Sequence, residues 1–264
     1  MSAPASQSVS LPGGFAPNTT LVRGEGSPVV FLHGPFGQEW SGFLNDVAAR
    51  HTVFAPAHPG AVEPNDLHQL DNLWDLMLYY DDVLAALGLD QVDLIGHSFG
   101  GMVAAELAAS FPQRVGKLVL IDALGLWRDD APVSDHVMVP PETQVELLYH
   151  DPNTPEVAAR LRLPEDPDKK VDALVHSVSA VASTSHFIWP IPDRGLAKRL
   201  RRVKAKTLIV WGKQDRLVPV VYADEFASRI ADARVRLIDN AGHVPYVERQ
   251  TQVSQLVNDF LATG

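Results

Sequence analysis

Residues 92–107 read VDLIGHSFGGMVAAEL, and this stretch decides the fold. It begins with the apolar run of a buried strand, and the residues after Gly100 have the pattern of a helix. Ser98 lies where the chain turns from one to the other. Gly96 and Gly100 flank the serine at positions where a Cβ would collide in such a tight turn. The stretch therefore predicts a serine hydroxyl held clear of the sheet, beside helix N-terminal N–H groups that stabilise negative charge.

Length, composition and charge predict one large α/β domain. The chain has 264 residues, of which 46% are hydrophobic and 20% charged, so nothing indicates disorder. Its net charge of -10 argues against nucleic acid or an anionic membrane as a partner, because phosphate binding needs concentrated lysine and arginine. The one basic run, residues 198–206, is expected to be a solvated helix face. With no cysteine, the chain has no disulfides, no thiolate metal sites and no cysteine nucleophile.

No targeting segment is visible in the sequence. Residues 1–8 lack the basic end and apolar stretch of a signal peptide, and no apolar run approaches the roughly 20 residues that a membrane helix needs. We therefore expect a cytoplasmic protein without a membrane partner. A small molecule, in our first hypothesis an apolar ester, is the expected partner, and the oligomeric state stays open.

Short apolar runs alternate with helical stripes along most of the chain, which predicts a mostly parallel sheet flanked by helices. Buried strands are expected at 29–32, 53–56, 92–95, 118–121, 207–211 and 234–238. Helices are expected at 73–87, near 223–230 and near 253–261. Glycines around residues 19–22 indicate a short antiparallel edge.

Residues 123–200 break this rhythm. Their prolines cluster between 132 and 155, and helical patterns occur at 143–149, 156–161 and 171–183. A segment of under about 80 residues without a strand is more easily stabilised by packing on a larger core than as a separate domain. We therefore expect a helical cap at 123–200, inserted into a core formed by 1–122 and 201–264.

Two later motifs supply the groups that a serine nucleophile needs. A serine hydroxyl is a poor nucleophile near neutral pH, so it requires a base and an acid that orients the base. Asp215 and His243 each follow a predicted strand, at the edge where open α/β sheets gather functional residues. The order Ser98, Asp215, His243 is the order expected for a triad on this kind of sheet. Asp122, after another predicted strand, is a less well matched candidate for the acid.

Together these motifs resemble the α/β-hydrolase superfamily, and within it a serine-nucleophile, esterase-like member with a helical cap. The resemblance extends from about residue 33 to the C-terminus. It rests on four motifs: His33-Gly34; GHSFGG at 96–101; Trp211-Gly212 with Asp215 and Pro219; and Gly242-His243 with Pro245 and Glu248. The resemblance implies Ser98 as nucleophile, His243 as base and acid, Asp215 as the orienting acid, and the Phe99 backbone N–H as one oxyanion donor.

The second oxyanion donor is harder to place. In relatives it often comes from the residue after His33-Gly34, which here is Pro35 and has no N–H. Phe36 is therefore our candidate. His33 and His97 flank the site and are expected to shape its loops, and no zinc-helix or phosphate-loop pattern appears, so we expect no cofactor and no metal.

A triad fixes acyl transfer but not the acyl donor. Hydrolysis of a small carboxylic ester is our first hypothesis, and an aspartate would be needed in place of Ser98 for a dehalogenase or an epoxide hydrolase. The alternative is a C–C bond hydrolase of ring-cleavage (meta-cleavage) products. Those enzymes often have asparagine before the nucleophile and tryptophan after the histidine, where this chain has His97 and Val244. A second alternative, a binding or receptor module with little turnover, is favoured only by Pro35.

Aromatic side chains of the expected cap suggest an apolar pocket. Trp127, Phe187 and Trp189 would roof it, together with Val244 of the core. The equally plausible alternative is that these aromatics only pack the cap onto the core. Substrate size therefore stays open.

Overall fold

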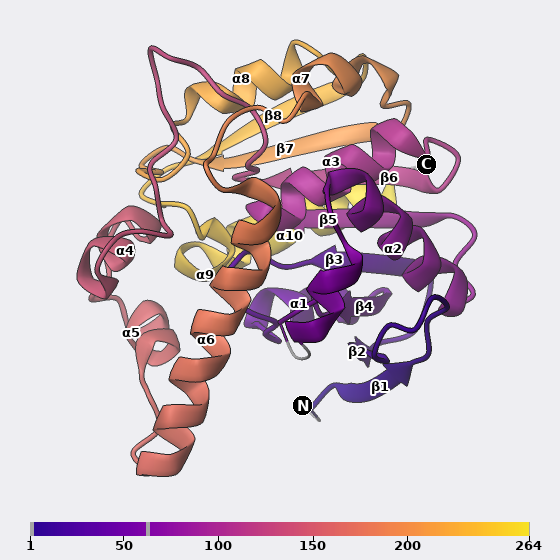
Figure 1. Cartoon of the computed structure of the whole chain (residues 1–264). Coiled ribbons are helices and arrows are strands. Elements are labelled where there is room, and N and C mark those ends of the chain that lie inside the picture. Colours follow the sequence, from indigo (N-terminus) through magenta and orange to yellow (C-terminus); the bar gives the residue numbers. More distant parts are fainter. Residues whose placement is uncertain (1–2, 62–63, 264) are drawn as a thin grey trace.

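Eight strands form one sheet in the computed structural model, which describes residues 3–61 and 64–263 (Figure 1). The strands are β1 (Ala5–Val9), β2 (Asn18–Arg23), β3 (Pro28–Leu32), β4 (Thr52–Pro56), β5 (Val92–His97), β6 (Val115–Ile121), β7 (Lys206–Gly212) and β8 (Ala233–Ile238). Their order is β1-β2-β4-β3-β5-β6-β7-β8. β2 is antiparallel to β1 and β4, and the other neighbours are parallel, which confirms the mostly parallel sheet. The strand expected near residues 19–22 is β2, which is antiparallel as predicted but is not the edge, because β1, which was not predicted, lies outside it.

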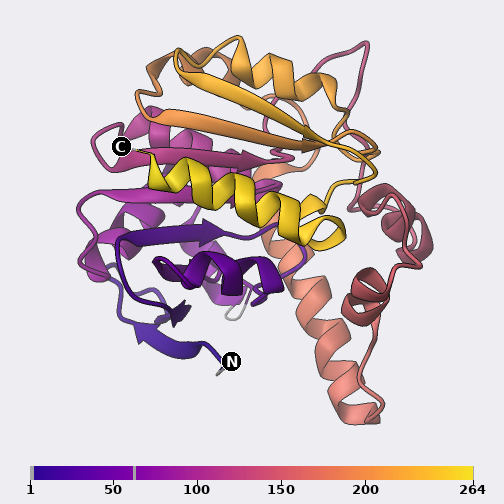
Figure 2. The same ribbon diagram turned by 180° about the vertical axis from the view of Figure 1, so that it is seen from behind.

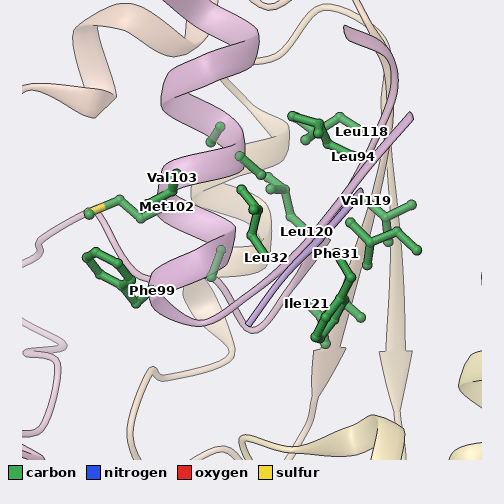
Figure 3. Close-up of a cluster of buried hydrophobic side chains, with 14 of the residues drawn as sticks. Phe31, Leu32, Leu94, Phe99, Met102, Val103, Leu118, Val119, Leu120 and Ile121 are labelled. Carbon is green, nitrogen blue, oxygen red and sulfur yellow. The ribbon is translucent and has the colours of Figure 1, made fainter. Parts of the chain in front are cut away.

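Burial on both faces explains why the central strands are continuous apolar runs. Figure 3 shows the labelled side chains of β3 and β6 alternating between the two faces of the sheet, together with Leu94 of β5. Toward helix α3 (Phe99–Ser110) lie Leu32, Leu94, Leu118 and Leu120, and on the other face lie Phe31, Val119 and Ile121. All seven side chains are at most 1% exposed. The parallel register brings His97 beside Ile121 and Gly212 beside Ile238, so the loops after these strands meet at one edge.

Helices cover both faces of the sheet. Figure 2 shows α1 (Gly42–Ala48) and α10 (Gln250–Ala262) side by side across one face. On the other face lie α2 (Leu73–Ala86) and α3, and α8 (Val221–Ala227) packs on β7 and β8. The predicted helices therefore form, within a few residues of their expected bounds. The remaining short elements of this part are a 3-10 turn, η1 (Pro64–Gln69), and α9 (Pro245–Glu248).

Residues 123–200 contain no strand, and every residue of this segment is described. Its helices are α4 (Pro141–Leu148), α5 (Pro155–Leu161), α6 (Pro167–Ile188) and α7 (Leu196–Arg199), with the 3-10 turn η2 (Leu200–Arg202) next. Two prolines of the cluster, Pro141 and Pro155, begin helices, as does Pro167, because a missing N–H and a fixed φ suit the first helical position. Figure 1 shows α4, α5 and α6 beside the end of the sheet where the parallel strands finish.

The two halves of α6 differ in their surroundings. Its buried residues, Ala180, Ser183, Thr184, Phe187 and Ile188, all belong to the C-terminal half. The N-terminal half projects from the body of the molecule beside α5 (Figure 1). No helix among residues 3–61 and 64–263 is long and apolar enough to cross a membrane. The division into core and cap stays a prediction.

Candidate active site

The turn between β5 and α3 has the geometry expected of a nucleophile elbow. Ser98 has φ 54° and ψ -118°, a left-handed conformation that L-residues other than glycine rarely adopt. A Cβ on Gly96 would lie 2.3 Å from the Gly100 carbonyl oxygen, and one on Gly100 would lie 2.1 Å from the Leu32 carbonyl oxygen. Only glycine fits at these two positions. The turn is thus held by the close approach of β3, β5 and α3.

Three residues distant in sequence form a hydrogen-bonded chain at this turn. The Ser98 Oγ lies 2.8 Å from His243 Nε2, and His243 Nδ1 lies 2.7 Å from Asp215 Oδ2. Because a carboxylate only accepts, Nδ1 carries the hydrogen, and Nε2 is left to accept the serine proton. The backbone N–H groups of Leu217 and Val218 donate to Asp215 Oδ1 at 2.8 and 2.9 Å and fix the carboxylate. This arrangement can remove a proton from Ser98 when the hydroxyl attacks a carbonyl.

The loop that carries His243 is attached to the segment after α4. The His243 N–H donates to the Leu148 carbonyl oxygen at 2.8 Å. Glu248 Oε2 accepts from the Gly242 N–H at 2.7 Å, while its Oε1 accepts from the N–H groups of His150 and Asp151 at 2.9 and 3.1 Å. One carboxylate therefore joins the histidine loop to the segment between α4 and α5.

Two further imidazoles next to the site are neutral and shape its loops, as expected. His97 donates from Nε2 to the His243 carbonyl oxygen at 2.7 Å, and burial lowers its pKa well below the usual value. His33 donates from Nδ1 to the Gly34 carbonyl oxygen at 2.7 Å, and burial lowers its pKa to about 4. Neither side chain contacts Ser98 through a hydrogen bond. Their bonds fix the backbone on both sides of the serine.

The loop after His33 passes directly beside the serine. A Cβ on Gly34 would lie 3.4 Å from the Ser98 Cβ. No acceptor among the described residues is hydrogen-bonded to the backbone N–H of Phe99 or of Phe36. Both N–H groups are therefore free to bind a substrate oxygen, and their role as oxyanion donors stays a prediction.

Asp122 lies in the same cluster at the end of β6. Its side chain is 0% exposed, and its Oδ1 accepts from the Gly212 N–H at 2.9 Å. Ligand atoms of Asp122, Asp215 and His243 all lie within 4.8 Å of one another. Burial and the nearby charge of Asp215 raise the pKa of Asp122 well above its usual value, which favours the neutral acid. The hydrogen bond to His243 belongs to Asp215, the acid that the sequence favoured.

One residue of the site was missed by sequence reasoning. His136, in the loop between β6 and α4, is 0% exposed, and neither ring nitrogen has a hydrogen-bond partner among the described residues. Its ring packs against Phe36 at 5.9 Å between centroids. Burial and the neighbouring His243 lower its pKa to about 4, so it is a neutral imidazole with one donor and one acceptor to offer. A lone histidine in a proline-rich loop matches no motif.

The four expected pocket residues differ in their burial. Phe187 is buried and its ring stacks on Phe99 at 6.4 Å, and Val244 is fully buried next to His243. The indoles of Trp127 and Trp189 are 38% and 48% exposed and bond to the carboxylates of Asp129 and Asp135. The structure thus brings Phe187 and Val244 to the interior beside the triad, and places both tryptophans at the surface.

A match to a known family agrees with this geometry. Residues 27–250 match the family described as the alpha/beta hydrolase fold. The chain belongs to the α/β-hydrolase family. Solved structures superpose on nearly the whole length of this chain. One of them, described as a putative lipase from Acinetobacter baumannii AYE, has a TM-score of 0.81 and 20% identity, and the superposition covers 98% of this chain and 91% of the lipase. A meta-cleavage product hydrolase from Pseudomonas fluorescens IP01 has a TM-score of 0.73, 19% identity and 97% coverage of both chains. At these identities the likeness shows the fold alone.

Curated relatives correct the expected reaction. A 2-hydroxy-6-oxo-6-phenylhexa-2,4-dienoate hydrolase from Burkholderia cepacia is 28% identical over 91% of this chain and 90% of its own length. A 2-hydroxy-6-oxo-2,4-heptadienoate hydrolase from Pseudomonas putida is 28% identical over 96% of this chain and 95% of its own length. These names support a hydrolase of C–C bonds, so the first hypothesis, a carboxylesterase acting on an apolar ester, is wrong. The two reactions use the same triad, so Ser98, His243 and Asp215 do not distinguish them, and His97 and Val244 do not exclude cleavage of a C–C bond.

Proposed function

We propose that this α/β hydrolase cleaves the C–C bond next to the ketone of a 2-hydroxy-6-oxo-2,4-dienoate, the meta-cleavage product class. The observation that carries the proposal is the match, over about nine-tenths of both chains, to relatives named for this reaction. The hydrogen-bonded relay of Ser98, His243 and Asp215 supports it, because the same three groups can cleave any activated acyl compound.

The first half of the reaction transfers the acyl group to Ser98. His243 Nε2 takes the serine proton while Oγ adds to the C6 carbonyl carbon, and the Phe99 and Phe36 N–H groups bind the resulting oxyanion. The C5–C6 bond then breaks. This cleavage proceeds from the keto tautomer, in which the proton of the 2-hydroxyl has already moved to C5. The electron pair of the broken bond forms the C4=C5 double bond and shifts the C3=C4 double bond to C2=C3, and the C2 oxygen takes the proton held by His243. The products of this half are 2-hydroxypenta-2,4-dienoate and an acyl ester on Ser98.

The second half releases the acid. His243 removes a proton from water, which attacks the ester carbonyl, and the proton returns to the Ser98 oxygen as the ester breaks. One water is consumed overall and a carboxylic acid leaves. Asp215 stabilises the imidazolium that forms in both halves.

We infer that residues 123–200 cap the site and exclude water during the reaction. Ser98 and His243 are both 0% exposed, and the segment contacts the histidine loop through the Leu148 carbonyl oxygen, which accepts from the His243 N–H. Entry of substrate therefore requires movement of the segment. His136 is a buried imidazole of this segment that packs on Phe36 and has no hydrogen-bond partner among the described residues, and we assign it the role of binding a substrate oxygen.

The proposal is tested with two of the named dienoates. The protein is mixed with 2-hydroxy-6-oxo-6-phenylhexa-2,4-dienoate or 2-hydroxy-6-oxo-2,4-heptadienoate, and the loss of dienoate absorbance is followed together with release of benzoate or acetate. Stoichiometric acid is expected, with kcat/KM above that for p-nitrophenyl acetate. Ser98→Ala is the control and should fall by at least about 10³-fold. Acid release no faster than in this control, or a higher kcat/KM for the ester, would overturn the proposal.

A further inference from the structure

Asp122 is a buried carboxyl beside the triad that the proposed relay does not use. One of its oxygens, Oδ1, accepts from the Gly212 N–H, and the other, Oδ2, has no partner that donates to it among the described residues. The residue is 0% exposed, so water does not supply a donor from the surface. A buried oxygen of this kind needs a physical explanation.

The neighbouring carboxylate provides one. Asp122 and Asp215 have oxygens within 4.8 Å of each other, and two buried carboxylates so close are not both ionised. Asp215 is the ionised member, since it accepts from two backbone N–H groups and from His243. A carboxylate offers about four acceptor sites, so these three donors leave one site open. An O–H on Asp122 Oδ2 fits that site.

The backbone around Asp122 connects the nucleophile to the acid loop. Asp122 has φ 44°, and its own N–H donates to the Val210 carbonyl oxygen of β7 at 3.1 Å. Two residues on, the Leu124 N–H donates to the Ser98 carbonyl oxygen at 3.0 Å. Left-handed backbone at a non-glycine residue persists only where surrounding bonds hold it. This turn therefore fixes where β7 ends and the Asp215 loop begins.

We propose that Asp122 is a positioning residue for the triad, a neutral carboxylic acid that accepts from the Gly212 N–H and donates its own O–H to Asp215. The inference rests on the proposed function only in that Ser98 is the nucleophile. Asp122 touches neither substrate nor the reacting atoms. It acts by holding Asp215 against His243.

Paired variants test the inference. Asp122→Leu fills a similar volume without a donor or acceptor, and it should lower kcat by about 10- to 100-fold with KM within about twofold, as for a buried hydrogen bond left unmade. Asp122→Asn keeps an acceptor for Gly212 and a donor for Asp215, and it should recover most of that loss. Asp215→Asn should lower kcat by about 10⁴-fold. If Asp122 were instead the acid that orients His243, the ranking of the two asparagine variants would be reversed, and the inference would fail.

A second readout makes the result independent of the C–C substrate. A fluorophosphonate reacts with an activated serine, so its labelling rate at Ser98 reports the relay directly. The same ranking of variants is expected: wild type, Asp122→Asn, Asp122→Leu, Asp215→Asn. If the labelling rates follow this order but the dienoates are not cleaved, the proposed function is wrong and the inference about Asp122 is still supported. Should Asp122→Leu not fold, the two asparagine variants still decide, and labelling of Asp122→Asn as slow as that of Asp215→Asn would refute it.

Activity at high pH distinguishes a proton donated from Asp122 to Asp215 from a role of Asp122 in packing alone. The titratable groups near Asp122 are Asp215 and His243, whose ligand atoms lie within 4.8 Å, and Glu248, whose charge also raises the Asp122 pKa. When Asp122 loses its proton in the wild type, it repels Asp215 and the donated bond is lost. The wild type should therefore decline at alkaline pH relative to Asp122→Asn, which has no such proton. If the activity of the wild type and of Asp122→Asn changed in parallel with rising pH, the donated proton of Asp122 would be contradicted.

Discussion

Replacing Glu248 with glutamine should separate the histidine loop from the segment after α4. The carboxylate is 8% exposed and accepts three backbone N–H groups, from Gly242, His150 and Asp151. Glutamine has nearly the same shape but a single acceptor oxygen. Whichever way its amide lies, an NH₂ group faces at least one of these N–H donors, and the remaining bonds lose the charge that strengthens them.

The size of the effect follows from those bonds. A hydrogen bond to a charged group contributes about 1.5–3 kcal/mol and a neutral one about 1 kcal/mol. One bond lost and two weakened therefore cost about 3 kcal/mol of unfolding free energy after local relaxation. For a chain of this size each kcal/mol lowers Tm by about 2–4 °C, so a decrease of about 6–12 °C is expected. Activity should also fall, because His243 follows Gly242 directly and a displacement of about 1 Å costs about 10²-fold in rate.

Thermal and urea unfolding of Glu248→Gln, followed by circular dichroism, measure this effect. Glu165→Gln is the matched control, because Glu165 is exposed and the substitution removes the same charge. The control should stay within about 0.5 kcal/mol of the wild type. A Glu248→Gln variant no less stable than the control would refute the conclusion that this carboxylate joins the two segments.

Three further outcomes are expected. Gly100→Ala puts a Cβ 2.1 Å from the Leu32 carbonyl oxygen and should lower the free energy of unfolding in urea by about 3 kcal/mol. Gly88→Ala is the control: its Cβ would have no atom within 4 Å, but the residue has φ 71°, so the loss should be about 1 kcal/mol. Equal losses would contradict the packing argument. The pKa of Asp122 is raised in the folded state, so its stabilising effect is complete below about pH 3.8 and is lost as pH rises. Asp122→Asn should thus gain stability over the wild type as pH rises above about 3.8, and a constant difference would count against a neutral Asp122. His136→Phe should raise KM for the dienoate about 10-fold with a smaller change in kcat, measured by steady-state kinetics, and an unchanged KM would remove His136 from the substrate site.

Much of the fold was predictable because its signals are local. The apolar runs and helical stripes report burial of single elements, and the strand-glycine-serine-glycine-helix stretch leaves one conformation for Ser98. The order of Ser98, Asp215 and His243 along the chain was enough to predict their convergence, since carboxyl ends of parallel strands share one edge. β1 and α1 were missed because neither has a strong periodic pattern, and their positions come from pairing with β2 and packing on α10.

The sequence by itself determined the sheet, the elbow and the three members of the relay, because each depends on residue types at fixed short spacings. Only the tertiary structure decided what surrounds them. It places Asp122, with a raised pKa, beside Asp215, and Glu248 between two segments; it buries His136 with no hydrogen-bond partner among the described residues, and it leaves Trp127 and Trp189 at the surface. These properties depend on which distant side chains meet and on how much water is excluded when they do. The protonation state and the burial of a side chain depend on many residues from distant parts of the chain, so the local pattern of residues does not predict them.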